Sequence, residues 1–260
     1  MKYAILGSGS NANSYLFSSG GFSVIIDNGF SCRECLRRMD VLGFDPSLVE
    51  YIFLTHTHGD HLRGVKVLSK KLRTPVVVHK MCRLNSIVSG GVYKTIPVEP
   101  GDEYSFNGLR VTPFETSHDA PHSLGYSFSL NGVTATILSD TGVVTEQMYA
   151  YVKKSDLLFL EANYNETLLE TGSYPRELKR RIASSKGHLS NSDAIEIMNR
   201  LQKEGDSRVR EVYFCHMSGN NNSPEKLAEE IKKGLLWDRK YVISPRGAMQ
   251  KGEIHNETDK

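Results

Sequence analysis

Residues 55–61 read Thr-His-Thr-His-Gly-Asp-His and follow directly on the apolar run at 51–54. Three imidazoles and a carboxylate thus lie in one short segment, just after what we predict to be a buried strand. Neutral imidazole and carboxylate are the ligands that zinc and similar divalent cations prefer, and packing alone does not require so many of them side by side. An exposed polar loop is the alternative, but such a density of ligands without a metal is rare. The sequence therefore predicts a metal-binding loop at the end of a strand.

Other predicted strands lead to ligand-type residues in the same way. Strands are predicted over residues 2–6, 15–17, 22–27, 76–79, 94–98, 103–106, 109–115, 124–130, 133–138, 157–160 and 209–215. The ligand-type residues that follow four of these strands are His118, Asp140, Glu161 and His216. Ligands of open sheets gather beyond the ends of strands, so we expect these side chains to converge on one cleft with the histidine loop, residues 55–61.

Helices are predicted from capping residues and from the spacing of apolar residues. They cover residues 31–42, 62–71, 81–88, 175–184, 190–203 and 224–234. The loop at 7–14 is so rich in glycine and small polar residues that its backbone amides are able to approach an anion closely, and an ordinary flexible connection is an equal alternative. The tail after Met249 is polar, and we expect it to be frayed.

Length and composition favour one globular α/β domain spanning residues 1–260, since 39% of the residues are hydrophobic and 24% are charged. No apolar run is long enough to cross a bilayer, and the first residues enter a strand without a signal peptide, so we expect a cytoplasmic protein with no membrane partner. Four scattered cysteines are too few for a disulfide framework, and we expect the Cys32/Cys35 pair to be structural. The net charge of +2 is too mild to indicate nucleic-acid binding by itself.

The ordered motifs resemble those of the metallo-β-lactamase-fold hydrolases, and the likeness runs over nearly the whole chain. Asp27 matches the structural aspartate of that family, and residues 56–61 match its His-x-His-x-Asp-His motif. Three later motif positions are matched by His118, Asp140 and His216. The resemblance implies an αββα sandwich in which two packed, mixed β-sheets are flanked by helices.

The same resemblance implies a ligand set. In the family, counterparts of His56, His58 and His118 hold one metal ion. The other ion is held by counterparts of Asp60, His61 and His216, with the counterpart of Asp140 bridging the two. Two divalent ions, Zn²⁺ or Mn²⁺ with iron possible, are able to share a hydroxide that serves as the nucleophile. Asp27 would orient the loop or a ligand histidine from behind.

Two further residues indicate the substrate class. Glu161 and His188 resemble the Glu/His pair that tRNA 3′-processing nucleases and related phosphodiesterases place beside their metals. An imidazolium held by a carboxylate is able to donate a proton to a leaving alkoxide. We therefore predict Asp60, Glu161 and His188 as catalytic, and a purely structural contact of His188 with a helix N-terminus stays open. The loops at 7–11, 187–191 and 216–221 resemble most the YycJ- or WalJ-type subgroup, which is associated with DNA exonuclease activity.

The leading hypothesis is therefore a dinuclear metal-dependent phosphodiesterase, a DNA exonuclease with nucleic acid as its substrate. Only about 75 residues separate Asp140 from His216, which leaves no space for the extra β-CASP domain of larger nucleases. Basic residues cluster at 66–73 and 176–186, where they would either follow a phosphate backbone or form solvated helix faces. A metal-dependent thioesterase or lactonase and a non-catalytic regulatory partner of the same fold are the alternatives. The sequence gives no indication of the oligomeric state.

Overall fold

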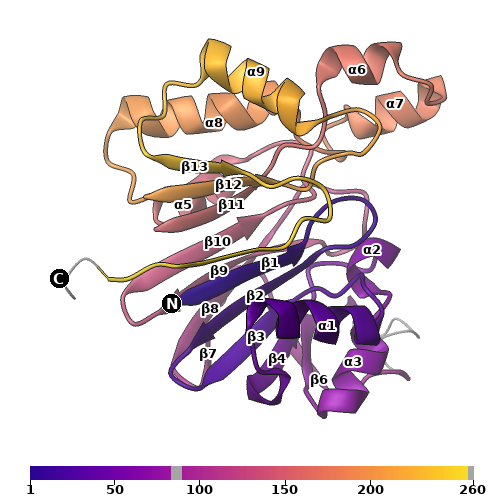
Figure 1. Ribbon diagram of the computed structural model, residues 1–260, viewed down its shortest axis with the longest axis vertical. Coiled ribbons are helices and arrows are strands. Elements are labelled where there is room, and N and C mark those ends of the chain that lie inside the picture. The colour runs from indigo at the N-terminus through magenta and orange to yellow at the C-terminus, as the bar shows by residue number, and fades with distance from the viewer. Residues whose placement is uncertain (83–89, 257–260) are drawn as a thin grey trace.

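The structure, a computed structural model, describes residues 1–82 and 90–256, and it consists of two seven-stranded β-sheets packed between layers of helices (Figure 1). The first sheet, sheet A, contains in spatial order β14 (Gln250–Glu253), β1 (Lys2–Gly7), β2 (Ser14–Ser19), β3 (Phe22–Ile26), β4 (Val49–Phe53), β5 (Val76–His79) and β6 (Thr95–Val98). The second sheet, sheet B, contains β13 (Lys240–Ile243), β12 (Glu211–Cys215), β11 (Leu157–Glu161), β10 (Val133–Leu138), β9 (Leu124–Leu130), β8 (Leu109–Glu115) and β7 (Tyr104–Phe106). The predicted αββα sandwich of two mixed sheets is confirmed.

Each sheet has an antiparallel part and a parallel part. Strands β3 to β6 run parallel in sheet A, and β10 to β13 run parallel in sheet B. Because parallel strands end at the same edge of a sheet, the loops that follow them emerge together. In Figure 1 these loops lie at the right, at the end of the sandwich away from both chain termini. The fold thus gathers the strand-end residues at one edge.

Alternation along the strands sends apolar side chains to both faces of each sheet. In β3, Val24 and Ile26 enter the core between the sheets, whereas Ile25 packs beneath the helices of sheet A. In β11, Phe159 faces the other sheet and Leu160 faces the helices of sheet B. Strands that are buried on both faces read as continuous apolar runs, which explains why the strand predictions succeeded here.

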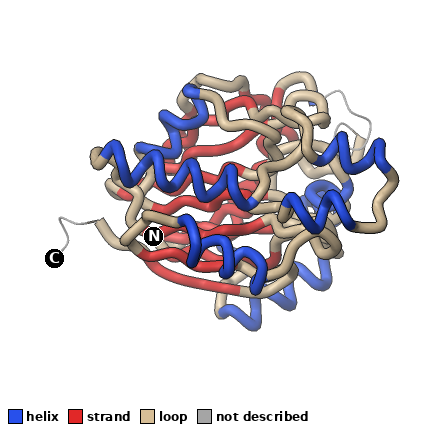
Figure 2. The backbone as a smooth tube through the Cα atoms, turned by 90° about the horizontal axis from the view of Figure 1, so that it is seen from above, coloured by secondary structure: helices blue, strands red, loops and turns tan. Residues whose placement is uncertain are grey.

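The helices cover the outer faces and the ends of the sheets. Sheet A is covered by α1 (Cys32–Leu42) and α3 (Val65–Leu72), and sheet B by α5 (Glu146–Lys153), α8 (Asn191–Glu204) and α9 (Pro224–Gly234). Figure 2, seen from above, shows long helices lying over the strands. The short elements are η1 (Pro46–Leu48), α2 (Gly59–Leu62), α6 (Glu166–Thr171) and α7 (Arg176–Ile182). Figure 1 shows that α2, α6 and α7 lie at the same end as the strand-end loops, so they border the site.

Several sequence predictions need correction. In the described part of the tail after Met249, Gln250–Glu253 is not frayed but forms β14 at the edge of sheet A, where Lys2 pairs with Glu253, and Ile254 is buried. The strand was not predicted because its residues are polar: an edge strand is held by backbone pairing rather than by an apolar face. The helix predicted at 62–71 is two helices, α2 and α3, and the first begins inside the histidine loop.

The segments that form α5, α6 and β13 were not predicted; they are short, with eight, six and four residues. Most of the helix predicted at 81–88 lies outside the described residues. Across residues 1–82 and 90–256, no helix combines the length and the apolar character needed to span a membrane.

Candidate metal centre

Three of the predicted site residues lie in an unusual backbone conformation directly beyond a strand. Asp27, Asp140 and His216 have φ values of 57°, 55° and 56°, in the left-handed region. This region is sparsely occupied by residues other than glycine, and the strain costs on the order of 1–3 kcal/mol per residue. The sharp turn aims each side chain across the strand ends. Such strain concentrates at functional sites, and here it coincides with the ligand-type residues.

The histidine loop follows β4 and is held close to two other segments of the same chain, around Asn13 and Gly29. The backbone carbonyl of Asp60 accepts a hydrogen bond from the backbone amide of Asn13 at 2.8 Å. Gly29 lies against the same carbonyl, and a Cβ on Gly29 would come within 1.8 Å of that oxygen. Asp60 and His61 lie in α2, whose start at Gly59 places them beside His56. Only a residue without a side chain leaves room for the loop at this point.

The structure brings the predicted ligands other than Asp140 together in two groups, and Asp140 belongs to two further, overlapping groups, one with His56 and His61 and one with Glu161, His188 and His216. The first group consists of His56, His58 and His118, and the second of Asp60, His61 and His216. Within each group the candidate ligand atoms all lie within 4.8 Å of one another.

Asp140 lies between the two groups. Its Oδ1 is 3.7 Å from His118 Nε2 and 3.5 Å from His216 Nε2, and its Oδ2 is 3.3 Å from His61 Nε2. A single carboxylate therefore faces both groups, which is the arrangement expected of a bridging ligand.

Buried atoms without partners test whether the residues fit a metal. His56 Nε2, His216 Nε2 and Asp140 Oδ2 are buried and have no hydrogen-bond partner among the described residues. Leaving a buried polar atom unsatisfied costs about 1–3 kcal/mol, so three such atoms in one place need an explanation. Imidazole nitrogens and a carboxylate oxygen form the donor set of zinc and manganese sites. The residues therefore fit divalent cations.

Asp27 supports the histidine loop from behind. It is fully buried, and its Oδ2 lies 2.7 Å from His61 Nδ1. Its Oδ1 accepts a hydrogen bond from the Thr55 amide at 2.8 Å, and Thr55 Oγ1 lies 3.0 Å from His56 Nδ1. Burial lowers the pKa of His61, but the charges of Asp140 and Asp27 outweigh it and raise that pKa to about 10. The same carboxylates would attract a divalent cation.

Glu161 and His188 lie beside the second group. Glu161 is fully buried, and its Oε1 lies 2.7 Å from His188 Nδ1 and 2.7 Å from His216 Nδ1. Burial raises the pKa of Glu161, but His188 and His216 together more than offset this and bring that pKa to about 2. Burial likewise lowers the pKa of His188, but Glu161 reverses the effect and the net shift is upward. One carboxylate thus orients both a candidate ligand and the imidazole next to it.

Two asparagines in the site were missed by sequence reasoning. Asn13 Nδ2 donates to Asp60 Oδ2 at 3.2 Å and lies 2.9 Å from His61 Nε2. Asn163 Nδ2 donates to the carbonyl of His216 at 2.8 Å. Asn13 lies in the glycine-rich loop that was singled out as a possible anion site, and the loop folds around its side chain, since Asn13 Oδ1 accepts from the Gly9 amide. No residue pattern marks either asparagine.

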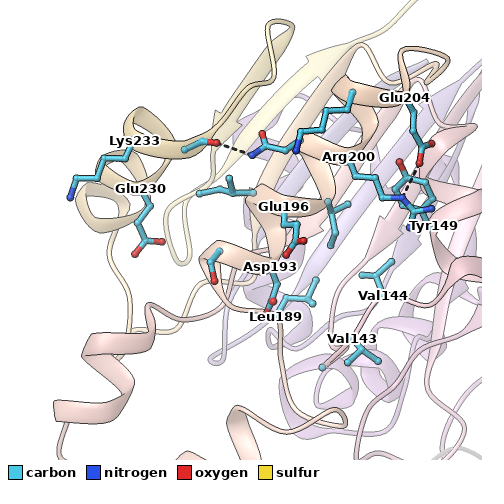
Figure 3. Close-up of a pocket in the computed structure, with 17 residues that line it drawn as sticks. Val143, Val144, Tyr149, Leu189, Asp193, Glu196, Arg200, Glu204, Glu230 and Lys233 are labelled. Atoms are coloured by element: carbon cyan, nitrogen blue, oxygen red, sulfur yellow. Dashed lines mark hydrogen bonds and ion pairs between the residues drawn. The ribbon is translucent and has the colours of Figure 1, made fainter.

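The ligands open into a small cavity of about 220 Å³. Its lining consists of Ser10, His58, Asp60, Asp140, Asn163, Tyr174, Leu178, Arg181, Ile182, His188, His216 and Ser218. A larger hollow of about 900 Å³ lies over α8, next to α5 and α9, and is lined by Val143, Val144 and other residues (Figure 3). None of the metal-binding groups found among the described residues involves that lining. Chemistry rather than volume therefore identifies the site.

The αββα sandwich and the two ligand groups at its strand ends together define the metallo-β-lactamase fold. Residues 23–217 match the family described as a β-lactamase superfamily domain, and the chain belongs to that family. The predicted resemblance to this family is confirmed.

Individual proteins of this family are also similar to the chain. The chain is 32% identical over 229 residues to the exodeoxyribonuclease WalJ of Streptococcus pneumoniae, covering 86% of this chain and 84% of that protein. It is 28% identical over 270 residues to the exodeoxyribonuclease YycJ of Bacillus anthracis, covering 100% and 96% of the two chains. Among solved structures, the metallo-β-lactamase fold protein YhfI from Bacillus subtilis has a TM-score of 0.72 at 18% identity, covering 96% of this chain and 99% of that one.

Proposed function

We propose that this chain is a metal-dependent phosphodiesterase that removes nucleotides from DNA ends. The observation that carries the proposal is the Glu161 carboxylate, which holds His188 beside a complete set of candidate ligands. Hydrolysis of an alkyl phosphodiester needs a proton for the leaving alkoxide, and His188 is placed to provide it. The two relatives named as exodeoxyribonucleases support DNA as the substrate.

The metal ligands divide between two cations. His56, His58 and His118 would hold one divalent ion, and Asp60, His61 and His216 the other, with Asp140 shared. Ions bound there would bring the pKa of water toward neutrality and neutralise the charge that develops on the phosphate. Asp27 and Glu161 act from behind, since their oxygens contact Nδ1 of a ligand histidine.

His188 is the residue that handles the leaving group. Its Nδ1 is bound to Glu161, which leaves Nε2 as the nitrogen that is able to meet a substrate. The side chain is 18% exposed and lines the cavity above the ligands. The contact with the Glu161 carboxylate favours the protonated ring, and the proton on Nε2 would pass to the departing oxygen. Glu161, which is fully buried, is a positioning residue.

The experiment compares two leaving groups. His188→Ala should slow the hydrolysis of end-labelled single- or double-stranded DNA by about 10²- to 10⁴-fold, the usual contribution of a general acid. The same variant should lose much less activity on bis-p-nitrophenyl phosphate, whose leaving group needs no proton. Equal losses on both substrates would assign His188 a role in metal binding or folding instead.

Controls establish the reaction class. His56→Ala should abolish DNA degradation in Mn²⁺ or Zn²⁺, and activity that persists in this variant would identify a contaminant. Acyl thioesters and lactones are assayed on the same sample, with metal content measured alongside. Turnover of acyl substrates without phosphodiester cleavage would replace the proposal with a thioesterase or lactonase, and absence of both would favour a regulatory partner.

A further inference from the structure

One wall of the metal cavity comes from a helical hairpin rather than from the ligand loops. The hairpin consists of α6 and α7, and it contributes Tyr174, Leu178, Arg181 and Ile182 to the lining. Opposite lie the ligands and the small polar residues of the strand-end loops. A cavity of about 220 Å³ is smaller than most pockets for whole ligands, so the rest of a nucleotide must extend past this wall.

A second cavity adjoins the first at Tyr174, which lines both. This hairpin cavity has a volume of about 590 Å³. Its lining combines rings and an aliphatic side chain with three cations and two carboxylates: Tyr164, Leu169, Tyr174, Arg176, Lys179, Arg180, Glu166, Glu170 and Ala183. A lining that combines aromatic rings with an excess of positive charge matches a nucleobase attached to a phosphodiester backbone.

Tyr174 is held in place by the loop that carries a metal ligand. Asn220 Nδ2 donates a hydrogen bond to the Tyr174 hydroxyl at 2.7 Å, four residues after His216. The ring also packs against the small apolar cluster formed by Tyr164, Leu169 and Ile182. A ring held by its hydroxyl and by this cluster loses little conformational entropy when a base stacks on it.

The hairpin itself is docked against the metal centre. Arg181 forms an ion pair with Asp119, whose Oδ1 lies 3.5 Å from His118 Nε2. At the start of the hairpin, the backbone amide of Asn165 donates a hydrogen bond to the backbone carbonyl of Asn221 at 2.8 Å. The position of Tyr174 is therefore fixed relative to the ligands, and a nucleotide whose phosphate lies at the metals would present its base to that ring.

We propose that Tyr174 and the hairpin cavity bind the nucleobase of the nucleotide next to the scissile phosphate. This inference rests on the proposed function. It makes Tyr174 a specificity-determining residue for nucleotides over other phosphodiesters, and it assigns the cations Arg176, Lys179 and Arg180 to the backbone beyond that nucleotide.

The experiment measures binding to the metal-loaded protein by isothermal titration calorimetry. Deoxyadenosine 5′-monophosphate should bind about tenfold or more tightly than deoxyribose 5-phosphate, which is the range that stacking of one base provides. Tyr174→Leu keeps an apolar side chain in the cluster and should remove this difference, whereas Tyr174→Phe should retain it. The affinity for inorganic phosphate should stay the same in all three proteins.

Two further variants keep the test independent of folding defects. Asn220→Ala removes the hydrogen bond to the Tyr174 hydroxyl without touching the hairpin core, as Tyr174→Phe also does, and should likewise retain most of the preference for the nucleotide. Tyr241→Leu is the matched control, because Tyr241 is an exposed tyrosine on β13 that lines neither cavity.

The outcomes separate the two proposals. Wild-type protein that does not distinguish the nucleotide from the sugar phosphate, or a Tyr174→Leu variant that still does, overturns the base site. Nucleotide preference in a protein that cleaves no DNA would overturn the proposed function and leave the base site standing.

Discussion

The two sheets supply the metal centre in different ways. Sheet A provides four candidate ligands from one loop, residues 56–61, and supports them with the carboxylate of Asp27. Sheet B provides one residue at a time from separate segments, among them His118, Asp140 and His216. A compact motif therefore identifies the chemistry, whereas residues spread over about a hundred positions complete the set of candidate ligands and support the proposed phosphodiester substrate.

The two halves also differ in how they are held. The histidine loop is fixed mainly by side-chain hydrogen bonds, from Asp27 through Thr55 to His56. The ligands of sheet B depend on left-handed backbone at Asp140 and His216, and on the buried Glu161 carboxylate. Loss of Asp27, the support in sheet A, should therefore weaken metal binding alone. Loss of Glu161, the support in sheet B, should weaken both metal binding and proton transfer.

The largest effect is expected at Asp140, the candidate ligand whose carboxylate oxygens face both groups. Asp140→Ala should lower kcat/KM for DNA about 10³-fold or more, because the charge stabilisation supplied by bound metals is worth several kcal/mol. Steady-state kinetics measures the loss. Asp206→Ala, at a carboxylate that is 66% exposed and lies outside the metal-binding groups, is the control and should be neutral. Activity within tenfold of wild type would remove Asp140 from the centre.

Metal content tests whether the two ligand groups, each of which combines residues from both sheets, hold one ion each. The wild type should bind about two ions per chain, and His58→Ala and His216→Ala should each reduce this to about one. Because an ion that binds only the folded state adds stability, chelation should lower the free energy of unfolding by about 4 kcal/mol when the ion was present at a thousandfold its Kd. Elemental analysis and urea denaturation give the two readouts. Loss of both ions in either variant would indicate one indivisible site.

The same difference between the sheets explains what could be predicted from the sequence. Doubly buried strands such as β11 were predicted from their continuous apolar runs, the αββα sandwich from the resemblance of the ordered motifs, and the histidine loop from its ligand density. The edge strand β14 was hidden because its stability comes from backbone pairing that leaves no side-chain pattern. Asn13 and Tyr174 were missed because a hydrogen bond or a cavity shared by distant segments has no local signature.

The supporting carboxylates provide a more graded comparison. Asp27→Asn and Glu161→Gln should each reduce metal affinity or activity about 10- to 100-fold, the usual cost of losing a carboxylate behind a ligand histidine. Asp27→Asn should be rescued largely by excess metal, since it acts only through His61 and the loop. Glu161→Gln should not, because it also releases His188. Activity measured across a metal titration separates the two, and full rescue of both variants would mean that proton transfer does not depend on Glu161.

The smallest effect is expected at the cysteine pair beneath sheet A, which resembles a metal motif but lies in the apolar core. Cys35 is fully buried next to Met39, and burial raises the pKa of its thiol to about 12. The thiolate that would bind a metal is therefore not available near neutral pH. Cys35→Ala should leave metal content and activity unchanged and lower the free energy of unfolding by about 1 kcal/mol, measured by urea denaturation. A fall in metal content would instead show that this cysteine pair takes part in metal binding, in addition to the histidine loop and Asp27. In that case the density of ligand-type residues would not be enough to distinguish the metal-binding segment of sheet A from the rest of the sheet.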